Sequence, residues 1–229
     1  MADNHNRFTN VRVLIFDLDG TLIDSKLDLA ISVNATLEYM GRPPLTHERI
    51  FSFVGNGAPV LVRRSLNDGA APGEITDAQV ERAVSYFLSY YRAHMLDNTV
   101  AYPGVREGLA LLGGRSMAVL TNKPVKFSKA IIEGLDLGRY FRFVYGGNSF
   151  ERKKPDPIGV RVLLRDLDLP AEAAMMVGDS EVDVRTARNA GIWACGVTYG
   201  LGVDGLKASP PDLFVDSLAD LPFHLNGTH

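Results

Sequence analysis

Four short segments of the chain carry the side chains whose types and spacing suit chemistry with oxygen ligands. They are Asp17, Asp19 and Thr21; Thr121 and Asn122; Lys154; and Asp179 and Asp183. Carboxylates brought together repel one another unless a cation neutralises them, and the all-oxygen donor set favours a hard cation, Mg²⁺. Mg²⁺ keeps coordination positions for phosphate oxygens, which favours phosphoryl chemistry. We expect Asp179 to complete the metal site and Asp183 to support it from one layer further out.

The other side chains match the remaining needs of phosphate-ester hydrolysis. One of the carboxylates of Asp17 and Asp19 can attack phosphorus and form an aspartyl-phosphate, which divides a difficult hydrolysis into two steps. The other can protonate the leaving alcohol and later take a proton from water. Lys154 can balance the charge of the phosphoryl group, and the Thr121 hydroxyl can donate a hydrogen bond to it.

These side chains lie at the ends of segments that the apolar pattern predicts to be strands. The β-branched and aromatic run at residues 11–16 predicts a buried strand that stops where Asp17 begins. Further strands are predicted over residues 117–120, 143–145, 173–177, 193–198 and 213–215, and helices over 103–112, 124–135, 157–167 and 182–190. Alternating strands and helices indicate an α/β fold, a Rossmann-like parallel sheet with helices on both faces. Ligands of such sheets bind outside the carboxyl ends of the strands.

Only helical patterns occur between the first predicted strand and the others. They include residues 25–40, 46–53 and a helix with Pro59 in its first turn, and Thr76 with Gln79 forms a capping-box pattern before a long helix. The first strand needs partners that come later in the chain. We therefore expect a catalytic core of residues 1–22 and 99–229, with an all-helical cap domain of residues 23–98 inserted in it.

Composition excludes several classes of protein. The 229 residues carry 24 basic and 27 acidic side chains, a formal net charge of −3, which gives no electrostatic footprint for nucleic acid or an anionic membrane. No apolar run approaches the ~18 residues that a membrane helix needs. The single cysteine, Cys195, cannot form an intrachain disulfide, and residues 1–10 have no apolar signal region, so we expect a cytoplasmic protein.

The motifs together resemble those of the haloacid dehalogenase superfamily. The resemblance rests on Asp17-Leu18-Asp19-Gly20-Thr21, Thr121-Asn122, Lys154-Pro155 and the segment from Gly178 to Asp183, in the usual order of that superfamily. It implies that Asp17 is the nucleophile and Asp19 the general acid/base. It also implies that Asp17, Asp179 and the main-chain carbonyl of Asp19 hold Mg²⁺, and that the helical insert is a cap over the substrate. Dehalogenases of the superfamily lack the second aspartate, so Asp19 favours a phosphatase.

Within the superfamily the chain is most similar to the phosphoglycolate phosphatases. The residues that carry this similarity are 53–57 and 61–64 of the insert, Thr121 to Pro124, and Thr198 to Gly200. Gly55-Asn56-Gly57 precedes a helix whose free N–H groups favour an anion. We therefore expect 2-phosphoglycolate as substrate, with Thr21 and Asn122 in the core and Gly55, Asn56, Gly57 and Arg63 in the cap as binding residues.

Other functions stay open on the sequence alone. A phosphomutase that moves a phosphoryl group between sugar hydroxyls, as β-phosphoglucomutases do, and a pyrophosphatase would share the core motifs. A non-catalytic regulator that binds a phosphorylated ligand is less favoured, because every catalytic side chain is present. The oligomeric state is expected to be monomer or homodimer.

Two further features are interpreted without a role in catalysis. Gly200 to Gly205 matches G-x-G-x-x-G, but residues 207–211 are expected to break the helix that a dinucleotide-binding fingerprint requires. We expect the Lys153 side chain to be exposed to solvent. The sequence does not decide whether Lys123 belongs to the site.

Overall fold

The computed structural model describes residues 7–226, which divide into two compact units. The first unit comprises the described residues up to Ile23 and those from Ala101 onward, and the second is Asp24–Val100. Two short strands, β2 (Ile23–Asp24) and β3 (Val100–Ala101), form a two-stranded sheet where the chain passes from one unit to the other.

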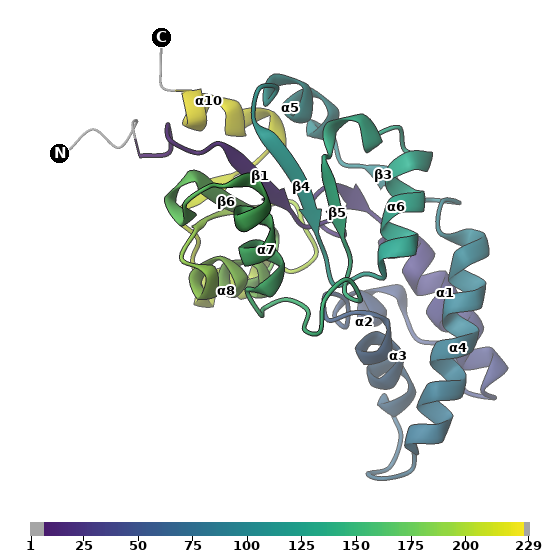
Figure 1. Ribbon diagram of the computed structural model, residues 1–229. Coiled ribbons are helices and arrows are strands. Elements are labelled where there is room, and N and C mark those ends of the chain that lie inside the picture. Colours follow the sequence, from purple (N-terminus) through teal and green to yellow (C-terminus); the bar gives the residue numbers. More distant parts are fainter. Residues whose placement is uncertain (1–6, 227–229) are drawn as a thin grey trace. The chain divides into compact units, whose positions relative to one another are not determined.

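The first unit is built on a six-stranded parallel sheet, which confirms the predicted α/β fold (Figure 1). In spatial order the strands are β5 (Phe143–Tyr145), β4 (Ser116–Leu120), β1 (Val13–Phe16), β6 (Ala174–Gly178), β7 (Trp193–Val197) and β8 (Leu213–Val215). The register places Val13 of β1 opposite Ser116 of β4 and Ala174 of β6. The first strand of the chain is therefore central, with partners more than a hundred residues away.

Helices surround this sheet (Figure 1). They are α5 (Val105–Leu111), α6 (Val125–Gly134), α7 (Ile158–Leu167), α8 (Glu181–Ala190), α9 (Val203–Ala208) and α10 (Leu221–Asn226). Short 3₁₀ turns occur at η2 (Gly138–Tyr140), η3 (Ala171–Ala173) and η4 (Leu218–Asp220).

Alternation along β1 divides the core between the two faces of the sheet. Val13 and Ile15 belong to a buried cluster with Val160 of α7 and Val184 of α8. Leu14 and Phe16, which are also fully buried, point to the opposite face because successive strand side chains alternate. Burial on both faces explains why the run from Val13 to Phe16 is apolar without a polar period. The core fixes the carboxyl end of β1, where Asp17 begins the site.

The second unit is helical throughout its longer elements. It contains α1 (Lys26–Tyr39), α2 (His47–Phe51), α3 (Ala58–Asn67) and α4 (Asp77–His94). The capping box predicted at Thr76 and Gln79 is present at the start of α4. Pro59 lies in the first turn of α3, as expected.

One short helix was not predicted. Residues 207–211 do end the helix after the G-x-G-x-x-G match, as expected, but a six-residue helix, α9 (Val203–Ala208), forms before that break. Its six residues fit between Gly202 and the prolines, and the buried side chain of Leu206 joins the core cluster. Tertiary burial thus offsets the weak helix propensity of the segment.

None of the helices among residues 7–226 is long and apolar enough to cross a membrane.

Candidate active site

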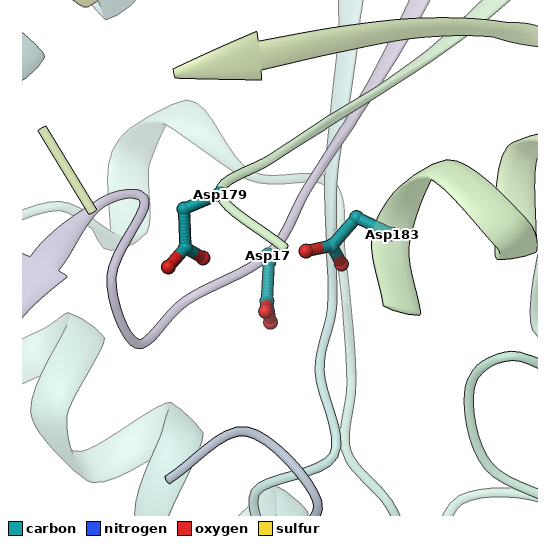
Figure 2. A group of neighbouring side chains, drawn as sticks. All are labelled: Asp17, Asp179 and Asp183. Carbon is teal, nitrogen blue, oxygen red and sulfur yellow. The ribbon is translucent and has the colours of Figure 1, made fainter. Parts of the chain in front are cut away.

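Three carboxylates meet at the carboxyl end of the sheet. One oxygen atom from each of Asp17, Asp179 and Asp183 lies within 4.8 Å of the others. In Figure 2 the Asp17 and Asp179 side chains extend in the same direction from the ends of β1 and β6, and the Asp183 carboxylate, from the first turn of α8, points toward Asp17. The chain thus brings together at one edge of the sheet three residues whose sequence positions span more than 160 residues.

Lys154 supplies the positive charge beside this acidic group. Its Nζ lies 2.9 Å from Asp17 Oδ1 and 2.6 Å from Asp183 Oδ1, and its side chain is buried. Burial alone would lower the pKa of Lys154, but the charges of Asp17 and Asp183 raise it above its ordinary value. A lysine that stays charged can neutralise phosphoryl oxygens next to Asp17.

Burial and mutual repulsion destabilise the ionised carboxylates of Asp17 and Asp179, and a bound cation would relieve both effects. Burial raises the pKa of Asp17 to about 6, although Lys154 opposes the shift. Burial and the charges of Asp183 and Asp17 raise the pKa of Asp179 to about 7. One lysine does not offset three carboxylates, of which Asp179 and Asp183 are buried and Asp17 is partly buried, and their donors are all hard oxygen atoms. The residues present therefore fit Mg²⁺.

Asp179 is held in place by the loop after β7. Its Oδ2 accepts hydrogen bonds from the N–H groups of Leu201 and Gly202, at 2.8 and 2.9 Å. Its Oδ1 accepts one from the Thr21 hydroxyl at 3.2 Å. The G-x-G-x-x-G segment thus has a role that the sequence interpretation missed, which is to direct two amides at a carboxylate. Thr21, predicted to bind substrate, is fully buried and contacts Asp179.

Asp183 is fixed by the start of its own helix. The backbone N–H and the hydroxyl of Ser180 donate to Asp183 Oδ2, at 3.2 and 2.6 Å. An acidic residue three positions after a helix-capping serine commonly reaches back in this way. The predicted position of Asp183, one layer behind the metal ligands, stays a prediction. Its carboxylate lies in the same group as those of Asp17 and Asp179.

Close backbone approach makes three glycines necessary around these carboxylates. A Cβ at Gly20 or Gly200 would overlap Asp179, and one at Gly178 would overlap Asp183. Gly20 also has a positive φ of 84°. The sequence contains all three glycines beside the motifs, but only the fold shows which atoms they approach.

Asp19 lies apart from the three-carboxylate group. Both of its carboxylate oxygens accept hydrogen bonds from Lys123 Nζ, at 2.9 and 3.1 Å. Lys123 follows Thr121 and Asn122 at the end of β4, and all three residues are buried. Thr121 Oγ1 accepts a hydrogen bond from the Lys123 N–H at 3.3 Å, and the Asn122 side-chain amide donates to the Lys154 carbonyl at 3.2 Å. The predicted core residues therefore form one connected site.

The residues predicted to bind substrate from the insert belong to the second unit. Gly55 and Gly57 have positive φ values of 115° and 85°, and Gly57 caps the N-terminus of α3. Arg63 is exposed on α3, where its guanidinium pairs with Asp77 at 2.7 Å. Asn56 lies in the turn between these glycines. Their roles in binding stay predictions.

Comparison with known proteins identifies the family. Residues 14–197 match the model of the haloacid dehalogenase-like hydrolases. The chain belongs to this family and is a phosphoric monoester hydrolase.

Several of the proteins to which this chain is similar are named phosphoglycolate phosphatases. The phosphoglycolate phosphatase of Pseudomonas fluorescens strain Pf0-1 is 41% identical over 214 residues, which cover 92% of this chain and 78% of that protein. Phosphoglycolate phosphatase 1 of Pseudomonas aeruginosa is 39% identical with the same coverage. A crystal structure from Haemophilus somnus, described as a predicted phosphoglycolate phosphatase, has a TM-score of 0.88 and 32% identity. It covers 93% of this chain and 97% of that one.

Proposed function

We propose that this hydrolase is a Mg²⁺-dependent phosphatase that converts 2-phosphoglycolate to glycolate and phosphate through an aspartyl-phosphate. The observation that carries the proposal is the group of Asp17, Asp179 and Asp183, with Lys154 in contact with Asp17 and Asp183. Such a group can bind a hard cation and a phosphoryl group together. The names of the relatives support phosphoglycolate as the substrate.

The first half of the reaction transfers the phosphoryl group to Asp17. An oxygen of the Asp17 carboxylate attacks phosphorus, and the bond between phosphorus and the alcohol oxygen breaks. Asp19 gives its proton to the leaving glycolate oxygen. Lys154 is placed to offset the charge that gathers on the phosphoryl oxygens.

The second half restores the free enzyme. A water molecule attacks the phosphorus of the aspartyl-phosphate, Asp19 takes the proton of that water, and the bond between phosphorus and the Asp17 oxygen breaks. Phosphate leaves, and Asp19 is again protonated for the next cycle. Asp17, Asp179 and the main-chain carbonyl of Asp19 are the groups that we assign to Mg²⁺, with Asp183 one layer behind them. When bound, the ion would neutralise charge on the phosphoryl oxygens.

The second unit is proposed to act as a cap that selects the substrate. The N-terminus of α3, preceded by Gly55-Asn56-Gly57, offers free N–H groups and the positive end of a helix dipole. Those groups suit the carboxylate of a small substrate. The guanidinium of Arg63 is already paired with Asp77, so a substrate carboxylate would have to compete with that ion pair.

A panel of small phosphate esters, assayed with Mg²⁺ and with chelator, tests this proposal. We expect 2-phosphoglycolate to be the fastest substrate, no turnover without metal, and a loss of about 10³-fold or more in Asp17→Asn. Rapid turnover of sugar phosphates or pyrophosphate instead would reassign the substrate. Isomer interconversion without phosphate release would indicate a mutase, and equal rates in wild type and Asp17→Asn would remove Asp17 as nucleophile.

We also propose a cellular location and an oligomeric state for the protein. The cytoplasmic location is inferred from the single cysteine, Cys195, which cannot form an intrachain disulfide. Burial raises the pKa of its thiol, which favours the protonated form. The oligomeric state stays a prediction of monomer or homodimer.

A further inference from the structure

Two lysines contact three of the four carboxylates of the site. Lys154 contacts Asp17 and Asp183, whereas Lys123 contacts Asp19 through both carboxylate oxygens. The Lys123 side chain is 5% exposed and the Asp19 side chain 16%. A buried pair with this geometry fixes the direction of the carboxylate more firmly than an exposed pair would.

The backbone around Lys123 is also fixed. Its N–H donates to Thr121 Oγ1, and its carbonyl accepts from the Gly147 N–H at 2.9 Å. A Cβ at Gly146 or Gly147 would overlap the backbone of residues 122–125, so the loop after β5 packs directly on this segment. A lysine side chain loses much conformational entropy when it is ordered. Here the ordering of the main chain and the partner carboxylate both limit where Nζ can lie.

We propose that Lys123 is a positioning residue that holds the Asp19 carboxylate apart from the acidic group and directed at the leaving oxygen. The inference rests on the proposed function, because it assigns Lys123 a part in the proton transfers of Asp19. Loss of Lys123 removes two hydrogen bonds and a positive charge from the Asp19 carboxylate, so the direction of that carboxylate is less constrained. Asp19 would be displaced from both proton transfers.

The two half-reactions depend on Asp19 to different degrees, which gives the inference a specific readout. Glycolate is a poor leaving group and needs a proton as the phosphorus–oxygen bond breaks. p-Nitrophenolate leaves without that proton, so p-nitrophenyl phosphate can form the aspartyl-phosphate when Asp19 is misplaced. Attack of water on the aspartyl-phosphate still needs Asp19 as base.

The test is a double-mutant cycle of Lys123→Met and Asp19→Asn, with Lys126→Met as a control. Lys126 is an exposed lysine three residues further along, on α6. We expect Lys123→Met to lower kcat on 2-phosphoglycolate roughly 30-fold in wild type and less than about twofold in Asp19→Asn, because the lysine acts through that carboxylate. With p-nitrophenyl phosphate, Lys123→Met should release a burst of about one p-nitrophenol per active site, followed by slow turnover.

Several outcomes would overturn the inference. An equal loss in both backgrounds would mean that Lys123 acts independently of Asp19, and slow release without a burst would place its effect on the transfer to Asp17. Wild-type kinetics in Lys123→Met would exclude any role. If Lys123→Met does not fold, Lys123→Gln, which keeps N–H donors but no charge, enters the same cycle. Absence of turnover by wild type on both esters would instead reject the proposed function itself, and this inference with it.

Discussion

The raised pKa values of Asp17 and Asp179 give the site a pH dependence with a definite sign. Burial raises both above the ordinary aspartate value of 3.8, to about 6 and about 7. The metal-free folded chain therefore holds protons more tightly than the unfolded chain. These groups contribute stability that is present below pH 3.8 and lost as pH rises toward 7. A bound cation reverses this effect, because it favours the ionised carboxylates.

We therefore predict that Mg²⁺ raises the thermal midpoint more at pH 8 than at pH 5. At pH 5 both carboxyls are largely protonated, and protons compete with the metal. Thermal unfolding with and without Mg²⁺ at the two pH values measures the difference. In Asp179→Asn the stabilisation by Mg²⁺ should be much smaller at both pH values. Equal stabilisation of the wild type at pH 5 and pH 8 would show that these carboxyls do not control metal binding.

The backbone of Gly200 lies so close to the Asp179 side chain that no Cβ fits between them. Gly200→Ala puts a methyl group where the Asp179 side chain lies, and it should lower Mg²⁺ affinity and activity roughly 10- to 100-fold. Metal titration by calorimetry and the phosphatase assay both measure this effect. Gly138→Ala is the matched control, because its new Cβ would meet only Ile132, at 3.9 Å. Comparable losses in both variants would contradict the role assigned to Gly200.

At the scale of the elements, a buried carboxylate joins the first and last segments of the helical unit. Asp28, in the first turn of α1, accepts hydrogen bonds from the backbone and side chains of Asn98 and Thr99. Its Oδ2 alone receives the Thr99 N–H at 2.8 Å and the Thr99 hydroxyl at 2.7 Å. This one side chain therefore satisfies donors on the segment just before β3, near the end of the helical unit.

We predict that Asp28→Ala lowers the free energy of unfolding by about 3 kcal/mol, because it leaves several donors without their acceptor. Urea denaturation followed by circular dichroism measures the change. Glu38→Ala, at an exposed position of the same helix, should cost less than about 0.5 kcal/mol. A loss below 1 kcal/mol in Asp28→Ala would mean that water replaces the carboxylate without penalty.

The sequence predicts most longer elements because their apolar periods are clear. The strands at Phe143–Tyr145 and Leu213–Val215 have the predicted bounds, and α7 begins one residue later than expected. Strands β2 and β3 were missed because two residues leave no period to detect. Helix α9 was missed because its stability depends on burial of Leu206, which local propensity does not contain.

The sequence predicts those site residues whose side-chain type indicates a chemical role. It does not predict contacts between residues that are distant in the sequence. Asp17, Lys154, Asp179 and Asp183 were predicted from the motifs, and they meet in the fold. The contact of Lys123 with Asp19 joins residues 104 positions apart, and no local pattern records such a pairing. The same reason explains why the amides of Leu201 and Gly202 were not assigned to Asp179.

At the scale of the whole molecule, the acidic group lies entirely in one of the two units. Asp17, Asp179, Asp183 and Lys154 all belong to the unit with the parallel sheet, while Asp24–Val100 forms the helical unit. The residues that we propose for metal binding and for the first contacts with phosphate therefore all belong to the first unit.

We predict that Mg²⁺ alone slows amide hydrogen exchange in the first unit and leaves residues 24–100 unchanged. The largest protection should occur in the loops that end β1, β6 and β7, because they carry or contact the carboxylates. Exchange monitored by mass spectrometry, with and without the metal, resolves the two units. Protection of the helical unit by Mg²⁺ alone would show that the ion's effect extends beyond its own unit.

The pairing of β2 with β3 has a consequence for how such enzymes diversify. The two ends of the inserted segment are held beside each other by a pair of short strands, so the sheet receives the insertion at a single point. Closing a loop of different length between fixed ends costs little, about 0.6 kcal/mol per doubling. A relative's insert should therefore be graftable between residues 24 and 100 without loss of folding. Recombination at this junction would exchange the unit that we propose to select the substrate and leave the residues proposed for phosphate chemistry unchanged.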